Sequence, residues 1–153
     1  MDHIILMIST GLYSGMLPVT PGIWGTAFGF LVWYGCRNLA RPVYLGITAG
    51  ICLVGGLAAG AAEKLLALAD AGPIVIDEVA GIFITLALAP NRRFIWLTGF
   101  LAFIALDSLK PFPAAWLDTH VHGGPGIMLD DVASGIYALL VVHLIHYICF
   151  RKR

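Results

Sequence analysis

Five acidic residues in three short segments of the chain could together bind a metal ion. They are Asp77 and Glu78, then Asp107, and then Asp130 and Asp131, and each lies within or beside an apolar stretch. Like charges that are packed together disfavour one another's ionised form unless a cation neutralises them. Carboxylates without histidine or cysteine partners suit a hard cation such as Mg²⁺, which also takes water and phosphate oxygens. The five residues therefore predict a magnesium site.

Two further features could bind phosphate beside such a metal. Lys110 follows Asp107 by three residues, so a helix through both would carry them on one side. The glycine-rich segment 122–126 precedes Asp130, and its exposed backbone N–H groups could hold an anion. Other phosphate chemistries lack their motifs, because the chain has no C-x5-R thiolate loop, no D-x-D-x-T nucleophile and no Walker A loop. Metal-assisted attack by water remains.

Plainer interpretations of the same residues stay open. The pair Asp130 and Asp131 could be a simple charge pair at the N-terminus of the last helix, and Asp77 with Glu78 could form a buried ion pair with Lys64 or Lys110. Asp70 and Asp118 are interpreted as solvated loop acids. His120 and His122 are ordinary loop residues or assist proton transfer. Gly25, Gly29 and Gly81 are predicted to be close-packing positions between helices.

The composition places these residues in a membrane protein. Of the 153 residues, 59% are hydrophobic and 12% are charged, whereas a soluble domain carries about 25% charged residues. The nine acidic and nine basic residues cancel, so there is no basic surplus for binding nucleic acid. At this length the expectation is one domain, residues 1–153.

Apolar stretches predict an all-α polytopic bundle with about five membrane crossings. A crossing needs about 20 mostly apolar residues, which residues 43–62 and 132–150 supply, and a shorter stretch, 23–36, can extend to residue 39. Residues 74–109 are interpreted as a helical hairpin, broken at Pro90. Residues 4–16 contain two glycines and favour an interfacial or re-entrant segment, so they are not among the five crossings; four crossings plus an interfacial or re-entrant segment is the alternative count.

If the chain crosses the membrane five times, the acidic and basic residues separate onto opposite faces of the membrane. Every acidic residue falls on one face, together with Lys64 and Lys110, and the other seven basic residues fall on the opposite face. The two arms of the hairpin, from Asp77 to Asn91 and from Arg93 to Asp107, are each about 21 Å long at 1.5 Å per residue. The five carboxylates are therefore expected at similar depth near one rim, where a charged residue usually marks a functional site.

Four segments together resemble the phosphatidylglycerophosphatase A family, the membrane Mg²⁺-dependent lipid phosphatases of bacterial phosphatidylglycerol synthesis. They are 20–26 (TPGIWGT), 74–81 (IVIDEVAG), 106–113 (LDSLKPFP) and 121–135 (VHGGPGIMLDDVASG). The acidic residues of the family's motifs match Asp77, Glu78, Asp107, Asp130 and Asp131, and its motif lysine matches Lys110. One position departs, because members commonly carry arginine where this chain has Ile104.

The resemblance implies hydrolysis of phosphatidylglycerol phosphate to phosphatidylglycerol and phosphate. It also implies that the protein is a multi-pass protein of the bacterial inner membrane. It implies that the five carboxylates bind Mg²⁺ and act in catalysis with Lys110. The substrate would be a phospholipid in the bilayer, bound by Thr20, Gly22, Lys110, His122, Gly123 and Gly124. The sequence leaves the oligomeric state open.

Two other functions are weighed beside this one. A small cation channel or carrier would use the acidic rim as a vestibule, but it gives no reason for Lys110 or for the glycine-rich segment. A catalytically inactive homologue would be consistent with Ile104. The orientation also stays open: the positive-inside rule places the basic face in the cytoplasm, whereas the family's substrate is made at the cytosolic leaflet, which favours an inward-facing acidic site.

Overall fold

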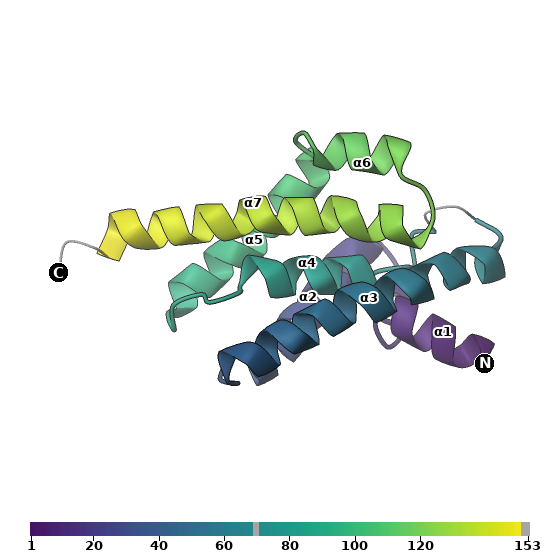
Figure 1. Cartoon of the computed structure of the whole chain (residues 1–153), viewed down its shortest axis with the longest axis horizontal. Coiled ribbons are helices and arrows are strands. Elements are labelled where there is room, and N and C mark those ends of the chain that lie inside the picture. Colours follow the sequence, from purple (N-terminus) through teal and green to yellow (C-terminus); the bar gives the residue numbers. More distant parts are fainter. Residues whose placement is uncertain (69–70, 151–153) are drawn as a thin grey trace.

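The computed structural model describes residues 1–68 and 71–150, and over these residues the regular structure is helical throughout (Figure 1). Asp70 and the basic C-terminal residues 151–153 lie outside the described residues. The elements in chain order are α1 (Asp2–Ser9), the 3₁₀ turn η1 (Ser14–Met16), α2 (Pro21–Cys36), α3 (Arg41–Leu66), α4 (Ile76–Thr85), α5 (Arg93–Leu109), α6 (Ala114–His120) and α7 (Gly124–Phe150).

Two of the described helices are long and apolar enough to cross a membrane by themselves. They are α3 with 26 residues and α7 with 27. A third span is formed if α5 and α6, which are bent by 50° at a short break, count as one. The expected helical segments 23–36, 43–62, 132–150 and the hairpin 74–109 are all present as α2, α3, α7 and the pair α4 and α5. A bundle of about five crossings is compatible with this arrangement.

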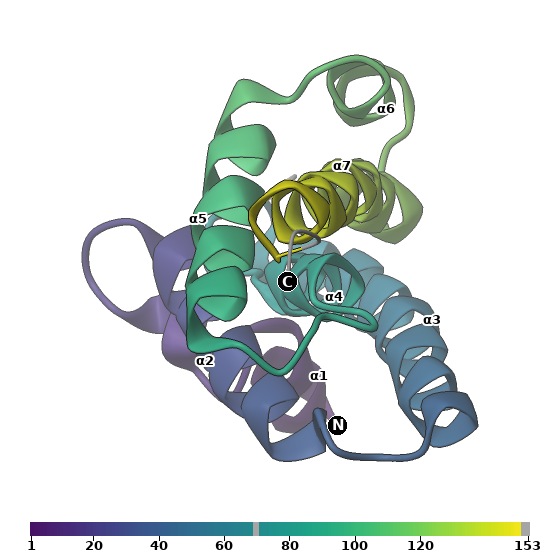
Figure 2. The same ribbon diagram turned by 90° about the vertical axis from the view of Figure 1, so that its left-hand side faces the viewer.

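The short helix α4 is the centre of the bundle. It packs against α2, α3, α5 and α7, and Figure 2 shows it enclosed by them. Its Ala80, Ile82 and Phe83 side chains are fully buried. With ten residues it is about 15 Å long, half of the roughly 30 Å hydrocarbon layer. The first arm of the hairpin is therefore shorter than the predicted 21 Å.

Glycines allow α4 to approach its neighbours closely. A Cβ atom added at Gly25 of α2 would lie 2.4 Å from the Val75 side chain, and one at Gly29 would lie 2.9 Å from the Val79 Cα atom. On the other side, a Cβ atom at Gly135 of α7 would lie 2.8 Å from the carbonyl oxygen of Gly81. The close-packing role predicted for Gly25, Gly29 and Gly81 is confirmed.

The start of the last helix differs from the expectation. The sequence predicts a helix from residue 132 preceded by a glycine-rich loop, but α7 begins at Gly124. The reason is a tertiary contact: a Cβ atom at Gly124 would lie 1.8 Å from the carbonyl oxygen of Gly56, so this glycine packs directly on the α3 backbone. Asp130 and Asp131 therefore lie inside α7, and the interpretation of them as a charge pair at a helix N-terminus is wrong.

Charges of opposite sign lie at opposite ends of the described fold. Arg37 follows the end of α2, Arg41 begins α3, and Arg92 and Arg93 begin α5. These helix ends share the end of the molecule at which α7 finishes, on the left of Figure 1. The N-terminus and the start of α7 lie at the other end. The acidic residues gather toward that second end, as the charge pattern predicts.

Candidate active site

All five predicted carboxylates and Lys110 line one cavity. Its volume is about 240 Å³, and its further lining residues are Pro21, Gly22, Gly72, Ile74 and Ile127. The acidic residues come from three helices that are separate in the sequence, α4, α5 and α7. The three acidic segments predicted from the sequence are therefore neighbours in space.

Each helix presents its acidic residues in a different way. Asp77 and Glu78 lie in the first turn of α4, where the positive end of the helix dipole favours a negative charge. Asp107 lies in the last turn of α5. Asp130 lies six residues after the start of α7, which places it about 9 Å along that helix. The site is thus recessed below the start of α7 rather than exposed at its tip.

Three of the carboxylates form the tightest group. Oxygen atoms of Asp77, Glu78 and Asp131 all lie within 4.8 Å of one another. Asp131 is only 3% exposed and Asp130 only 5%, and Asp77 and Glu78 are half-buried. Several acidic groups so close together and so little solvated can all stay ionised only if a cation lies between them.

Three carboxylate oxygens at this cavity are buried without a hydrogen-bond partner among the described residues. They are Oε2 of Glu78, Oδ1 of Asp130 and Oδ2 of Asp131. A buried acceptor without a donor is costly, and a bound cation would remove that cost. The donor set contains only carboxylates, which is the ligand type that Mg²⁺ prefers. The residues present therefore fit a magnesium ion.

Lys110 contributes the positive charge at the edge of this group. Its Nζ atom lies 2.6 Å from Oδ2 of Asp130 and 2.7 Å from Oδ1 of Asp118. Partial burial alone would lower the pKa of Lys110, but the hydrogen bonds and charges of Asp118 and Asp130 outweigh it and raise the pKa above its ordinary value. Lys110 is therefore a permanently charged group that also fixes one oxygen of Asp130.

The remaining predicted site residues are distributed around the cavity. Gly22 lines it, and a Cβ atom there would lie 2.6 Å from Oε1 of Glu78; Thr20 is exposed at the start of α2. His122 and Gly123 line a neighbouring cavity of about 140 Å³, which shares Ile127 with the first. Gly124 is not brought to either cavity, because it is buried against α3.

Two acidic residues near the site were not singled out by the sequence. Asp118 is predicted as a solvated loop acid, but it lies on the short helix α6 and pairs with Lys110. Glu63, in the last turn of α3, lines the neighbouring cavity with Asp118 and His122. The sequence contains one signal for the pair with Lys110. Asp118 follows Lys110 by eight residues, and a turn at the two prolines between them can bring the two side chains together.

Comparison with known proteins gives a consistent family match. The family model described as phosphatidylglycerophosphatase A matches residues 7–146. The chain is 36% identical to phosphatidylglycerophosphatase A of Escherichia coli over 91% of this chain and 81% of that protein. It is also 36% identical to the Haemophilus influenzae protein of the same name, over 94% of this chain and 89% of that one.

A relative with a different name is also similar. The chain is 30% identical to a putative phosphatidylinositol-3-phosphatase of Bacteroides thetaiotaomicron, over 94% of each chain. No solved structure matches the chain. The named relatives thus share a phosphate ester as substrate and differ in the lipid that carries it.

Proposed function

We propose that the chain, which belongs to the phosphatidylglycerophosphatase A family, hydrolyses phosphatidylglycerol phosphate to phosphatidylglycerol and phosphate in phospholipid synthesis. The observation that carries the proposal is the single cavity lined by five carboxylates and Lys110. Those are the residues that a metal-dependent phosphatase needs, because the metal and the lysine together can neutralise a phosphate group. The chain is an enzyme, and the channel interpretation is not favoured.

Magnesium is proposed as the cofactor. Asp77, Glu78 and Asp131 are close enough to hold one ion together, with Asp107 and Asp130 at the same cavity. When bound, the ion polarises the phosphate ester and makes an attacking water more acidic. The partnerless oxygens of Glu78 and Asp131 are the atoms best placed to bind it.

The reaction itself is a transfer of the phosphoryl group to water. A carboxylate oxygen of the cavity takes one proton from the water, and the water oxygen forms a bond to phosphorus. The bond between phosphorus and the glycerol oxygen breaks, and that oxygen takes a proton to become the hydroxyl of phosphatidylglycerol. Lys110, held by Asp118 and Asp130, stabilises the negative charge on the phosphate oxygens.

The substrate is proposed to stay in the bilayer during the reaction. The apolar helices α3 and α7 are long enough to cross it, and residues of α2, α4, α5 and α7 line the cavity. Only the headgroup of the lipid then has to reach the carboxylates, while the two acyl chains remain among other lipids. We place the enzyme in the bacterial inner membrane as a multi-pass protein.

Phosphate release by the purified protein in mixed micelles tests this function. We expect release from phosphatidylglycerol phosphate to stop with EDTA and to return with added Mg²⁺. Phosphatidylinositol 3-phosphate serves as the second substrate, since one relative is named for it. Equal activity with EDTA would contradict the magnesium proposal, and a clear preference for the inositol lipid would contradict the proposed substrate.

A further inference from the structure

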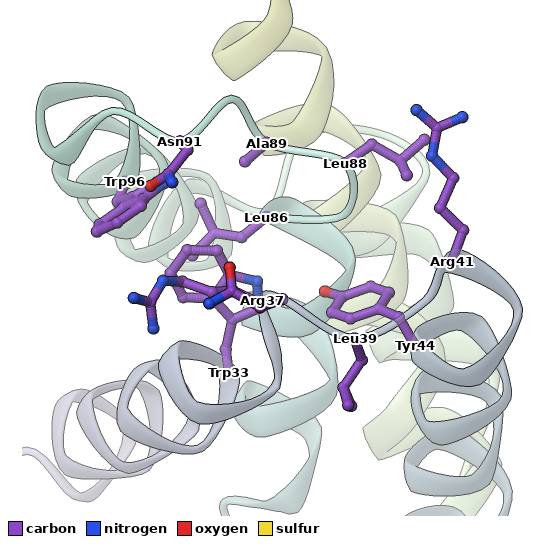
Figure 3. A pocket seen from close by; sticks show the side chains of 11 residues that line it. Trp33, Arg37, Leu39, Arg41, Tyr44, Leu86, Leu88, Ala89, Asn91 and Trp96 are labelled. Carbon is purple, nitrogen blue, oxygen red and sulfur yellow. The ribbon is translucent and has the colours of Figure 1, made fainter.

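A second large cavity lies at the end of the molecule opposite to the carboxylates. Its volume is about 270 Å³, and it opens between the connection from α2 to α3 and the connection from α4 to α5 (Figure 3). Its polar lining comes from Arg37, Arg41, Asn38 and Asn91, and its aromatic lining includes Trp33 and Trp96. None of these residues takes part in the proposed hydrolysis.

The charges at this cavity are not compensated within the described chain. Lys110 pairs with Asp118 and Asp130 at the other end, and neither Arg37 nor Arg41 forms an ion pair with a described residue. Arg37 and Arg41 therefore have no acidic partner there, and the exposed residues Arg92 and Arg93 add positive charge at the same end. A cavity with uncompensated guanidinium groups favours an anionic ligand.

Arg37 is held in place by its neighbours. Its guanidinium carbon lies 3.6 Å from the centre of the Tyr34 ring and 5.4 Å from that of Trp96, and one terminal N–H group donates to the Tyr34 carbonyl oxygen. Its Nε atom, however, is buried and has no hydrogen-bond partner among the described residues. A buried donor without an acceptor is costly, and a ligand that offers Arg37 an acceptor, such as a phosphate oxygen, would lower that cost.

The arrangement of the cavity suits a headgroup better than a larger ligand. Figure 3 shows Arg37 on one side of the Tyr44 ring and Arg41 on the other, with their guanidinium groups pointing away from each other, so positive charge lies on two outer sides of the cavity. Pockets for drug-sized ligands measure about 300–1,000 Å³, and this cavity is slightly smaller. It also lies where α2 ends and α3 begins, the level at which a spanning helix reaches the lipid headgroups.

We propose that this cavity is a second, non-catalytic phosphate-binding site, which binds the headgroup of an anionic phospholipid in the leaflet opposite to the carboxylate cavity. Basic pockets between membrane helices bind anionic headgroups in this way. Free inorganic phosphate offers the same oxygens but no glycerol or acyl chain. The proposal does not depend on the catalytic one, since the two cavities share no lining residue.

Lipid binding to the purified protein in neutral detergent tests the proposal, with the tryptophan fluorescence as the signal, since two of the four tryptophans, Trp33 and Trp96, line the cavity. The ligands are dihexanoyl phosphatidylglycerol, dihexanoyl phosphatidylcholine and inorganic phosphate, all with EDTA so that the carboxylate cavity repels anions. We expect saturable binding of phosphatidylglycerol only. The double variant Arg37→Gln with Arg41→Gln should bind it at least about tenfold more weakly.

The double variant Arg92→Gln with Arg93→Gln is the matched control, because it removes the same charge from the same end without touching the cavity lining. It should change the affinity less than about threefold. Asn91→Asp, which keeps both cavity arginines and adds a carboxylate, should weaken binding as the first double variant does. Phosphate release by each variant, measured with Mg²⁺, reports whether it is folded.

Three results would overturn the proposal. Equal weakening by the two double variants would mean general attraction to a basic surface. Equal binding of phosphatidylcholine would mean that the negative charge of the headgroup is not recognised. Binding of inorganic phosphate as tight as that of the lipid, with the same dependence on Arg37 and Arg41, would make free phosphate the ligand and overturn the lipid assignment.

Discussion

At the scale of single residues, the acidic side chains of the carboxylate cavity are both close to one another and buried. Asp131 illustrates this, because it is 3% exposed, shares a cluster with Asp77 and Glu78, and keeps one oxygen without a partner. A residue in that position is expensive in the folded protein unless it binds something positive. Cation binding is therefore the best explanation for this buried carboxylate.

The substitution Asp131→Asn tests that use. Asparagine has the same shape but no charge, so the fold should be retained while the affinity for the cation falls. We expect turnover at saturating Mg²⁺ to decrease by about two powers of ten or more, measured as phosphate released from phosphatidylglycerol phosphate. The control is Asp2→Asn, an exposed acid in α1; a similar loss in both variants would contradict a specific role for Asp131.

Lys110 gives a prediction about pH. Its pKa lies above the ordinary value of 10.5 because its pairs with Asp118 and Asp130 outweigh its burial, so the side chain stays charged from neutral pH to at least about pH 10. Loss of the lysine proton should therefore not limit activity in that range. The pH profile of kcat checks this by comparing the wild type with Lys110→Arg, whose guanidinium keeps its proton at still higher pH.

The two profiles should coincide in shape up to about pH 10, even if the arginine variant is slower throughout. Lys110→Gln should lose at least about tenfold in activity at every pH, since it removes the charge and leaves Asp130 without its partner. A fall in activity between pH 8 and 10 that is present in the wild type and absent in Lys110→Arg would contradict the raised pKa.

At the scale of elements, glycines decide how closely α4 approaches α5 and α7. A Cβ atom at Gly81 would lie 2.3 Å from carbon atoms of the Phe103 ring, which is itself fully buried. We expect Gly81→Ala to destabilise the protein by about 1–3 kcal/mol through overpacking, measured by thermal unfolding in detergent.

Gly50→Ala in α3 is the matched control. Nothing lies within 4 Å of a Cβ atom at that position, and alanine is the better helix former by about 1 kcal/mol. This variant should therefore unfold at the same temperature as the wild type or slightly higher. Equal melting temperatures for Gly81→Ala and the wild type would mean that α4 and α5 are less tightly packed than described.

The sequence predicted the helical segments better than their ends. Apolar length was enough to find α2, α3 and α7 because a membrane helix must satisfy its own backbone. It could not show that α7 begins at Gly124, since a Gly-Pro-Gly run is typical of a loop and only its packing on the α3 backbone favours a helix. The early end of α4 at Thr85 likewise has no signal in the apolar residues that follow it.

The candidate site was predicted more completely than the fold around it. All five carboxylates and Lys110 could be found because charged residues are rare in apolar stretches and each needs a reason. The ion pair of Lys110 with Asp118 could not be predicted, since it depends on how α6 folds back after α5. Gly124 was assigned to phosphate binding because a glycine-rich segment has the same composition whether it binds an anion or packs on a helix.

At the scale of the whole molecule, the two ends carry opposite charges and should face opposite sides of the membrane. Variants for labelling replace the three cysteines Cys36, Cys52 and Cys149 by alanine and introduce one new cysteine, either His3→Cys or Arg93→Cys. We expect an impermeant maleimide added to intact cells to label only one of the two. If both positions are labelled, or neither is labelled until the cells are opened, the number of crossings between positions 3 and 93 is not odd and the prediction is wrong.

The same measurement decides the orientation that the sequence leaves open. Labelling at position 3 would place the acidic end outside, as the positive-inside rule indicates. Labelling at position 93 would place the carboxylates at the cytosolic leaflet, where the family's substrate is made. In either case the carboxylate cavity and the cavity lined by Arg37 and Arg41 would lie at opposite leaflets.

The placement of α4 has one more consequence, which concerns the energy stored across the membrane. Its Asp77 and Glu78 line the carboxylate cavity, and Leu86, which follows its far end, lines the cavity of Arg37 and Arg41, so one short helix separates two cavities that are lined by charged residues. Between them lie Ile82 and Phe83, both fully buried, beside Leu86, which is 1% exposed. This apolar layer interrupts any file of water along which protons could hop. The proposed metal site could therefore lie within an energised bilayer without opening a path for protons from one side to the other.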